Sequence, residues 1–399
     1  MKKNNADVTE HVIESEIRKE MRFIIALSCG KISRDEVISH IKPIIDNINW
    51  RDVIDKAIKY QLLPILYYNL KNIIPDMVPE EILEEMRGYY QNNLIRSMIQ
   101  TKELLQIIQI CNDHQIPVIP YKGLVLSALV YGDIGLRVSS DIDIIVHKSN
   151  VLRLKNLLVS NGYKTFLHLA PYQEDTYLLN QCEYNLIHPK KTTVEIHWQF
   201  APKYSLSFFE EEIIWDNSYQ RSFEGKEITV LSHEMQIIAL SVHAGKHEWN
   251  NIRHICDLAG FISKTEQVNW NRVMHYAKEY RINQLIFLGL GLVERLTKVT
   301  IPVEISRKIK ADKKVQYLIQ DRIEQIFSER LDATGEIQHS KTWISFLDSY
   351  KDKIHTILFL CFIPTSDDWK IVTLNKKFSF LYYIIRPLRL LHKFVLKGG

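Results

Sequence analysis

The segment DIDIIV at residues 141–146 constrains the fold of this chain more than any other segment. Its apolar, β-branched character predicts a strand, and side chains alternate between the two faces of a strand. Asp141 and Asp143 therefore share one face, ~7 Å apart at a rise of ~3.3 Å per residue, while Ile142 and Ile144 share the other. The pattern predicts a sheet that is apolar on one side and carries acidic groups on the other.

The segment TTVEIHWQF repeats this alternation, with Glu195 and His197 on one face of a predicted strand. If the two strands are neighbours, Glu195 joins Asp141 and Asp143 in a cluster that repels itself unless it is neutralised. Carboxylate oxygens suit Mg²⁺ or Mn²⁺, and Mg²⁺ normally arrives with substrate phosphates. The alternative is that these are surface carboxylates without a role, because Asp-x-Asp occurs about once by chance in a chain of this length.

Two nearby features favour the metal interpretation. Lys122 and Gly123 follow the apolar run IPVIPY and precede the helix-like GLVLSALVYG, so they lie at a strand-to-helix turn. Free backbone N–H groups at such a turn bind phosphate. Arg137 lies four residues before Asp141 and can hold a phosphate oxygen pair with its guanidinium group.

The pattern of apolar residues divides the chain into three parts. Residues 1–113 show apolar residues at helical spacing, and residues 232–399 are again helical. Residues 114–231 alternate short strand-like and helical runs. We therefore expect an α+β protein in which a small mixed β-sheet domain at 114–231 is flanked by N- and C-terminal helical regions.

Bulk composition narrows the function classes. A formal charge of +4 over 399 residues does not by itself indicate nucleic-acid binding. The five cysteines are scattered without a Cys-x-x-Cys pair, which favours a reducing cytosol. The apolar run TILFLCFI near the end is too short to span a bilayer, so we expect a cytoplasmic protein without a membrane span.

The end of the chain is basic. No acidic residue follows Asp368, and seven lysines and arginines are interleaved with apolar residues (370, 376, 377, 386, 389, 393 and 397). This tail could bind an anionic membrane, an RNA or an acidic substrate. We expect instead that its apolar side packs on the domain, because Pro387 interrupts a long membrane helix.

The order of these motifs resembles a known family. Lys-Gly, then YGD-x-G-x-R, then Asp-x-Asp with its apolar strand, and a later Glu in VEIHW look like the nucleotidyltransferase superfamily related to DNA polymerase β. More narrowly, the pattern resembles the uncharacterised bacterial nucleotidyltransferases in which Lys-Gly replaces the usual Gly-Ser. The motifs cover roughly residues 115 to 200.

The resemblance implies roles for single residues. Asp141 and Asp143 would be metal ligands, and Glu195 would be a third ligand or the base for the acceptor hydroxyl. Gly123 would admit the triphosphate of an NTP to the helix N-terminus. The phosphate contact of the missing serine falls to Lys122, or to one of the serines that precede Asp141 (Ser139, Ser140).

The resemblance extends more loosely to LSVHAGKHEWNNIRHICDLA. There it implies that Lys246, and as a further candidate Arg253, faces the triphosphate, with Asp257 orienting one of them. His243 and His247 lie four apart on a predicted helix and, with His254 and Glu248, could instead bind zinc. No HExxH signature supports zinc, so we do not favour it.

The implied activity is transfer of a nucleotidyl group from an NTP to a hydroxyl or phosphate of an acceptor, with release of pyrophosphate. The acceptor could be a small metabolite, a sugar or a biosynthetic peptide. An alternative is a toxin-like enzyme that modifies tRNA, because R-x-S-x-D-x-D also looks like the motif of abortive-infection nucleotidyltransferase toxins. A second alternative is a non-catalytic nucleotide-binding or scaffold protein, but retention of three mutually repelling acids argues against it.

Overall fold

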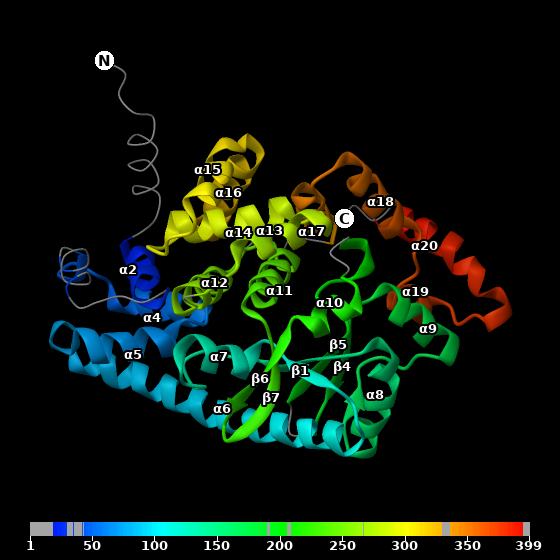
Figure 1. Cartoon of the computed structure of the whole chain (residues 1–399), viewed down its shortest axis with the longest axis horizontal. Coiled ribbons are helices and arrows are strands. Elements are labelled where there is room, and N and C mark those ends of the chain that lie inside the picture. The colour runs from blue at the N-terminus through cyan, green and yellow to red at the C-terminus, as the bar shows by residue number, and fades with distance from the viewer. Residues whose placement is uncertain are drawn as a thin grey trace.

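The computed structural model describes residues 19–29, 35, 42, 44–189, 192–205, 209–265, 267–328 and 336–393. Helices dominate, and a five-stranded sheet lies among them (Figure 1). The expected α+β class is confirmed. The strands are β1 (Val118–Pro120), β2 (Asp141–Val146), β3 (Lys164–Thr165), β4 (Glu183–Ile187) and β5 (Thr193–His197).

The sheet is mixed and has the strand order β1-β2-β5-β4-β3. Strands β2 and β5 run parallel, and the other three pairings are antiparallel. In the β2–β5 register Asp143 lies opposite Glu195. The two acidic strands identified from the sequence are therefore neighbours at the centre of the sheet.

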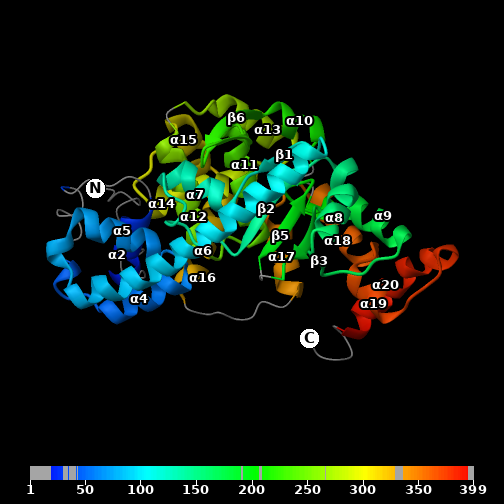
Figure 2. The same cartoon turned by 90° about the horizontal axis from the view of Figure 1, so that it is seen from below.

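One face of the sheet is apolar and covered by helices. Ile142, Ile144, Val194 and Ile196 belong to a buried core that they share with the long helix α6 (Glu80–Asp113), with α7 (Gly123–Tyr131) and with α8 (Val151–Ser160). Figure 2, seen from below, shows α6 running from the N-terminal helices across to the sheet. The acidic side chains of β2 and β5 therefore lie on the opposite face of the sheet from these helices.

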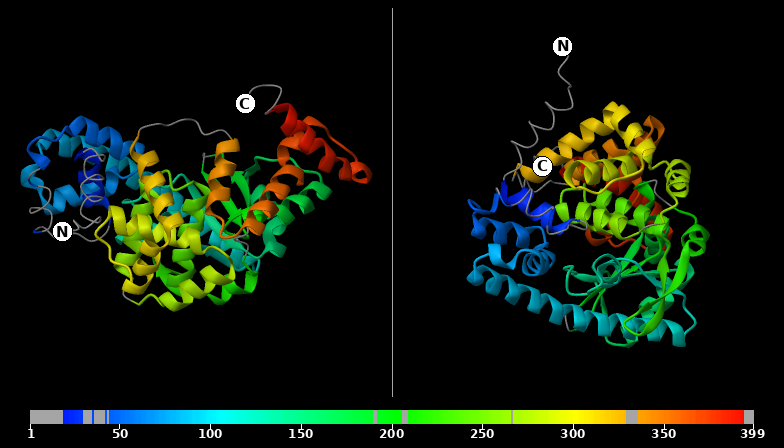
Figure 3. Two further views of the ribbon diagram at one scale, coloured as in Figure 1. Left: turned by 90° about the horizontal axis from the view of Figure 1, so that it is seen from above. Right: turned by 60° about the vertical axis from the view of Figure 1, so that its left-hand side comes forward.

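A second, larger core combines buried residues of the N-terminal helices with those of helices in the C-terminal region. Figure 3 shows the blue N-terminal helices beside the yellow helices of the C-terminal region. The N-terminal helices are α2 (Lys19–Ser28), α4 (Trp50–Lys59) and α5 (Leu63–Ile73). The C-terminal helices in this core are α11 (His233–Lys246), α12 (Ile252–Lys264), α13 (Trp270–Glu279), α14 (Asn283–Leu296), α15 (Val303–Ala311), α16 (Lys313–Phe327) and α17 (Glu336–Phe346).

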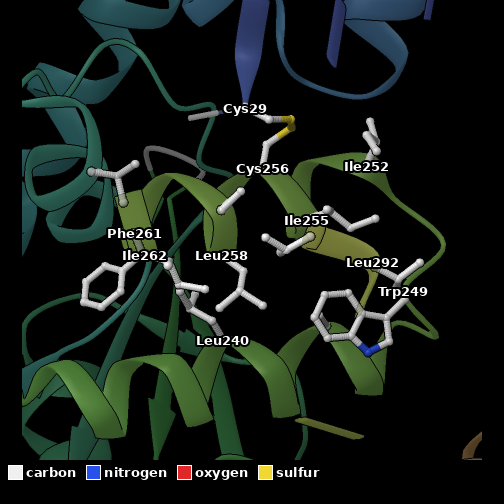
Figure 4. Packing of buried hydrophobic residues seen from close by; sticks show 14 of the residues in the cluster. Cys29, Leu240, Trp249, Ile252, Ile255, Cys256, Leu258, Phe261, Ile262 and Leu292 are labelled. Atoms are coloured by element: carbon white, nitrogen blue, oxygen red, sulfur yellow. A yellow bond between two sulfur atoms is a disulfide. The ribbon is translucent and has the colours of Figure 1, made fainter. Parts of the chain in front are cut away.

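A disulfide crosses this core. It joins Cys29, which follows α2, to Cys256 of α12 (Figure 4). The two cysteines are 227 residues apart, and nothing in their spacing indicates that they pair. The disulfide departs from the reducing setting that the scattered cysteines favoured. Helix α12 is thereby tied to the N-terminal helices.

The remaining elements surround the sheet and form the C-terminal end. They are α9 (Pro171–Asn180), α10 (Glu211–Asp216), the hairpin of β6 (Ser218–Phe223) and β7 (Lys226–Leu231), α18 (Tyr350–Phe362), α19 (Ser366–Ile371) and α20 (Tyr382–Leu391), with short 3₁₀ turns at Pro75–Met77, Lys148–Asn150, Lys203–Ser205 and Lys376–Leu381. None of the described helices combines the length and apolar character that a bilayer crossing requires.

The basic tail packs less completely than we expected. Tyr382 and Arg386 of α20 are buried, and Arg386 pairs with Asp368 at 3.1 Å. The other side of α20 stays open, with four large apolar side chains exposed (Tyr383, Ile384, Leu388 and Leu391). Lys397, the last basic residue of the tail, lies outside the described residues.

Candidate active site

Strand pairing brings the carboxylates together. Asp143 and Glu195 lie side by side on β2 and β5, and His197 lies beside both. The Nε2 of His197 is 3.0 Å from Oδ1 of Asp143 and 3.2 Å from Oε2 of Glu195. Ligand atoms of these three residues all lie within 4.8 Å of one another. Asp141 shares the face two residues earlier on β2 and accepts a hydrogen bond from the Ser140 hydroxyl at 3.1 Å.

The pKa values of the residues in this cluster are shifted in different directions. Burial opposes the charge of Asp143, yet the ammonium of Lys122 at 2.6 Å and the His197 ring hold the pKa of Asp143 well below its usual range. The pKa of Asp141 is raised, first by burial and then by the negative charges of Asp143 and Glu195. Hydrogen bonds to Asp143, Cys182 and Glu195 raise the pKa of His197 in spite of its burial. Lys122 and His197 thus offset only part of the negative charge of this cluster.

The turn at Lys122 and Gly123 requires a glycine. Gly123 begins α7 with φ +54°, a left-handed conformation that costs a residue with a Cβ about 1–2 kcal/mol. A Cβ at this position would also lie 2.9 Å from Oγ of Ser139. Ser139 donates to the backbone carbonyl of Asp141 at 2.9 Å, so the segment before β2 lies directly against the start of α7.

Arg137 is held by a buried partner. Its Nε lies 3.0 and 3.1 Å from the two carboxylate oxygens of Asp257, and its Nη2 lies 3.0 Å from Oδ2. The family resemblance implied that Asp257 orients Lys246 or Arg253. In the structure it orients Arg137, which lines the site beside the serines and aspartates.

Lys246 has a different carboxylate partner, which the sequence analysis missed. Its Nζ lies 2.7 Å from Oε2 of Glu183, and Glu183 lies opposite His197 in the β4–β5 register. Burial opposes the charge of Glu183, but Lys246 and then His197 lower its pKa to about 2. Glu183 starts the strand EYNLI, and only the antiparallel pairing of this strand with β5 reveals that it faces the site.

Three imidazoles form the opposite wall. The rings of His243, His247 and His254 have centroids 4.7, 5.4 and 5.5 Å apart in their three pairings. Burial and neighbouring cations lower the pKa of all three, that of His247 to about 4. Among the described residues, the sets of three donor atoms within 4.8 Å of one another do not include these histidines, so the arrangement does not support the zinc alternative.

These groups line one cavity of about 340 Å³, within the range of pockets that take small molecules. Acidic groups come from the sheet. Basic groups come from α11, α12 and the segment between them, and also from Lys122 before α7 and Arg137 before β2. Most of the site residues predicted from the sequence line this cavity, and the exceptions are Gly123, Glu248 and Asp257. The lining residues are Gln61, Lys122, Arg137, Ser139, Ser140, Asp141, Asp143, Glu183, Glu195, His243, Lys246, His247, Asn250, Asn251, Arg253 and His254.

Comparison of the sequence with protein families identifies a family for most of this chain. A family model described as "Uncharacterised nucleotidyltransferase" matches residues 46–298, more than half of the chain. No curated protein matches the sequence significantly.

Two solved structures are similar over part of the chain. A lincosamide antibiotic adenylyltransferase, LnuA, solved with lincomycin, is 20% identical, with 41% of this chain and 97% of that chain covered and a TM-score of 0.31. An antigenic nucleotidyltransferase-like protein from Paracoccidioides brasiliensis is 14% identical, with 51% and 94% covered and a TM-score of 0.30. Both scores are too low to bear on the substrate of this chain.

Proposed function

Because the chain belongs to the family of uncharacterised nucleotidyltransferases, we propose that it transfers a nucleotidyl group from an NTP to a hydroxyl or phosphate of an acceptor and releases pyrophosphate. The observation that carries this proposal is the pairing of Asp143 with Glu195 on adjacent parallel strands, within a cavity whose far wall is basic. An acidic side for metal and a basic side for phosphate suit a reaction that depends on positioning and charge neutralisation.

The donor set fits a divalent metal. Asp141, Asp143 and Glu195 offer hard oxygen ligands from one face of the sheet, and the raised pKa of Asp141 reflects burial and a surplus of negative charge that a cation would relieve. We propose these three residues as the ligands of Mg²⁺ or Mn²⁺. When bound, the metal would neutralise phosphate charge and make the acceptor hydroxyl more acidic.

The other side chains have proposed roles in binding the nucleotide. Gly123 leaves room at the N-terminus of α7, where backbone N–H groups attract phosphate. Ser139 and Ser140 stand beside this turn with their hydroxyl groups. Lys122 neutralises Asp143 until the nucleotide complex forms, and Arg137 is kept in a fixed orientation by Asp257.

The test of the function is pyrophosphate release with each of the four NTPs and Mg²⁺ or Mn²⁺, in a lysate that supplies acceptors. The Asp141→Asn/Asp143→Asn double variant should lose at least about 100-fold in rate, the scale of losing groups that stabilise transition-state charge. Asp113→Asn is the matched control, because Asp113 ends α6 and does not line the cavity. Equal release by the double variant would rule out these carboxylates as the catalytic centre.

A further inference from the structure

The basic wall of the cavity contains polar atoms without partners. His254 is 7% exposed, and its Nδ1 has no hydrogen-bond partner among the described residues. The Nε of Arg253 is likewise buried and unpartnered in the described part of the chain. A buried polar atom without a hydrogen-bond partner costs free energy. A ligand in the cavity that hydrogen-bonds to these two atoms would remove this cost.

The charges of the wall indicate the sign of that ligand. Three cations of the cavity are already neutralised by carboxylates, in the pairs Lys122–Asp143, Arg137–Asp257 and Lys246–Glu183. Arg253 has no carboxylate within 4.0 Å among the described residues. It donates instead to the side chain of Gln61 and, at 3.2 Å, to the carbonyl of Val138. This part of the cavity therefore has a surplus of positive charge and suits an anion.

We propose that Arg253, His247 and His254 bind the two terminal phosphates of the nucleotide and hold the pyrophosphate after transfer. This inference rests on the proposed function, which puts the reacting phosphate at the carboxylates of β2 and β5. The terminal phosphates then extend toward the opposite wall, which is formed by the end of α11, the following loop and the first turn of α12. His243, hydrogen-bonded to Lys122 at 3.3 Å, connects this wall to the turn before α7.

Binding of such an anion is coupled to protons. In the free protein, burial is the largest factor that lowers the pKa of the three histidines. The surrounding cations add to it from each neighbouring element: Lys122 before α7, Arg137 before β2, Lys246 at the end of α11 and Arg253 on α12. Glu183 of β4 opposes them at His247. A phosphate against these rings favours the imidazolium form, so binding takes up protons.

The experiment is calorimetric titration of the full chain with inorganic pyrophosphate, without metal, at pH 7 in two buffers of different ionisation enthalpy. The difference between the two heats gives the number of protons taken up. We expect proton uptake by the wild type, and a loss of most of it together with about tenfold in affinity in His247→Gln/His254→Gln. His275→Gln, an exposed histidine of α13, should behave as the wild type does.

Arg253→Gln is the second variant. It removes a half-buried cation that has no carboxylate partner in the described part of the chain, and it leaves the histidines in place. We expect it to weaken pyrophosphate binding about tenfold while the protein stays folded at the temperature of the titration. If the double histidine variant does not fold, this variant and the proton uptake of the wild type decide the question.

Unchanged affinity in Arg253→Gln, or no proton uptake by the wild type, would overturn the inference. These outcomes are separate from those of the transfer assay. Proton-coupled pyrophosphate binding that is lost in these variants supports the anion site even if no NTP is consumed. Nucleotidyl transfer that depends on Asp141 and Asp143, combined with unaltered pyrophosphate binding in the variants, would reject the anion site alone.

Discussion

The ammonium of Lys122 lies 2.6 Å from Oδ1 of Asp143, and both side chains are buried at the centre of the site. Asp143 also lies 3.0 Å from the His197 ring. Lys122 and His197 therefore place positive charge next to Asp143, one of the proposed metal ligands. A divalent cation that binds Asp143 must compete with Lys122, which links metal affinity to the stability of this ion pair.

Replacement of Lys122 should show that metal affinity and the stability of this ion pair are linked. Lys122→Met leaves Asp143 buried without its main partner, and we expect a loss of about 3–5 kcal/mol in unfolding free energy without metal. Mg²⁺ or Mn²⁺ should then stabilise the variant more than the wild type, because the cation replaces the missing charge. Urea unfolding with and without metal measures both effects.

The control for this prediction is Lys155→Met, which breaks the largely buried pair of Lys155 with Glu174 away from the cavity. This variant should lose stability without any additional response to metal. If Lys122→Met responds to metal no more than the wild type does, the proposed competition is wrong.

The turn before α7 offers a test of the close approach of Ser139. Gly123→Ala should cost about 1–2 kcal/mol for its positive φ, plus the cost of the contact at 2.9 Å with Oγ of Ser139. Gly132→Ala is the matched control, because Gly132 also has a positive φ but nothing within 4 Å of an added Cβ. Thermal unfolding should show the larger loss for Gly123→Ala, and Ser139→Ala should reduce that excess. A loss no larger than that of Gly132→Ala would contradict the role of the contact.

The sequence revealed those parts of the site that depend on local periodicity. The alternation of DIDIIV and VEIHW places Asp141, Asp143 and Glu195 on one face because the period of a strand is two. The partners of these groups depend on tertiary packing instead. Glu183 reaches the site through the register of β4 with β5, and no pattern in the sequence specifies that register.

The same limit applies to the basic wall. Asp257 is 120 residues from Arg137, its partner in the fold. The spacing of His243 and His247 indicated one helix face, but only the packing of α11 on α12 brings His254 beside them. Whether these rings serve as metal ligands or as neutral bases depends on the cations around them, and helical spacing does not reveal those neighbours.

The Arg137–Asp257 pair should matter for both stability and nucleotide binding. Asp257→Asn leaves a buried guanidinium without a counter-charge, and we expect a loss of about 3–5 kcal/mol in unfolding free energy. Since Arg137 is then no longer fixed, the KM for the NTP should rise more than kcat falls. Steady-state kinetics of pyrophosphate release measure this. If Asp257→Asn lowers stability but leaves KM unchanged, Arg137 does not contact the nucleotide.

Acid should destabilise the protein through His247. The pKa of this side chain is about 4 in the folded chain and 6.5 for an unperturbed histidine, so the unfolded chain binds the extra proton between these values. The contribution of His247 to stability is complete above pH 6.5 and is lost as the pH falls toward 4. Because His247 keeps contact with solvent at the cavity, screening reduces the loss to roughly 1 kcal/mol.

His197 acts in the opposite sense, because its raised pKa favours the folded state at low pH. The comparison of wild type with His247→Gln cancels that effect, since His197 is present in both proteins. Urea unfolding from pH 7 to pH 4 should show a shallower loss of stability in the variant. Parallel curves for the two proteins would mean that His247 is not held neutral by the fold.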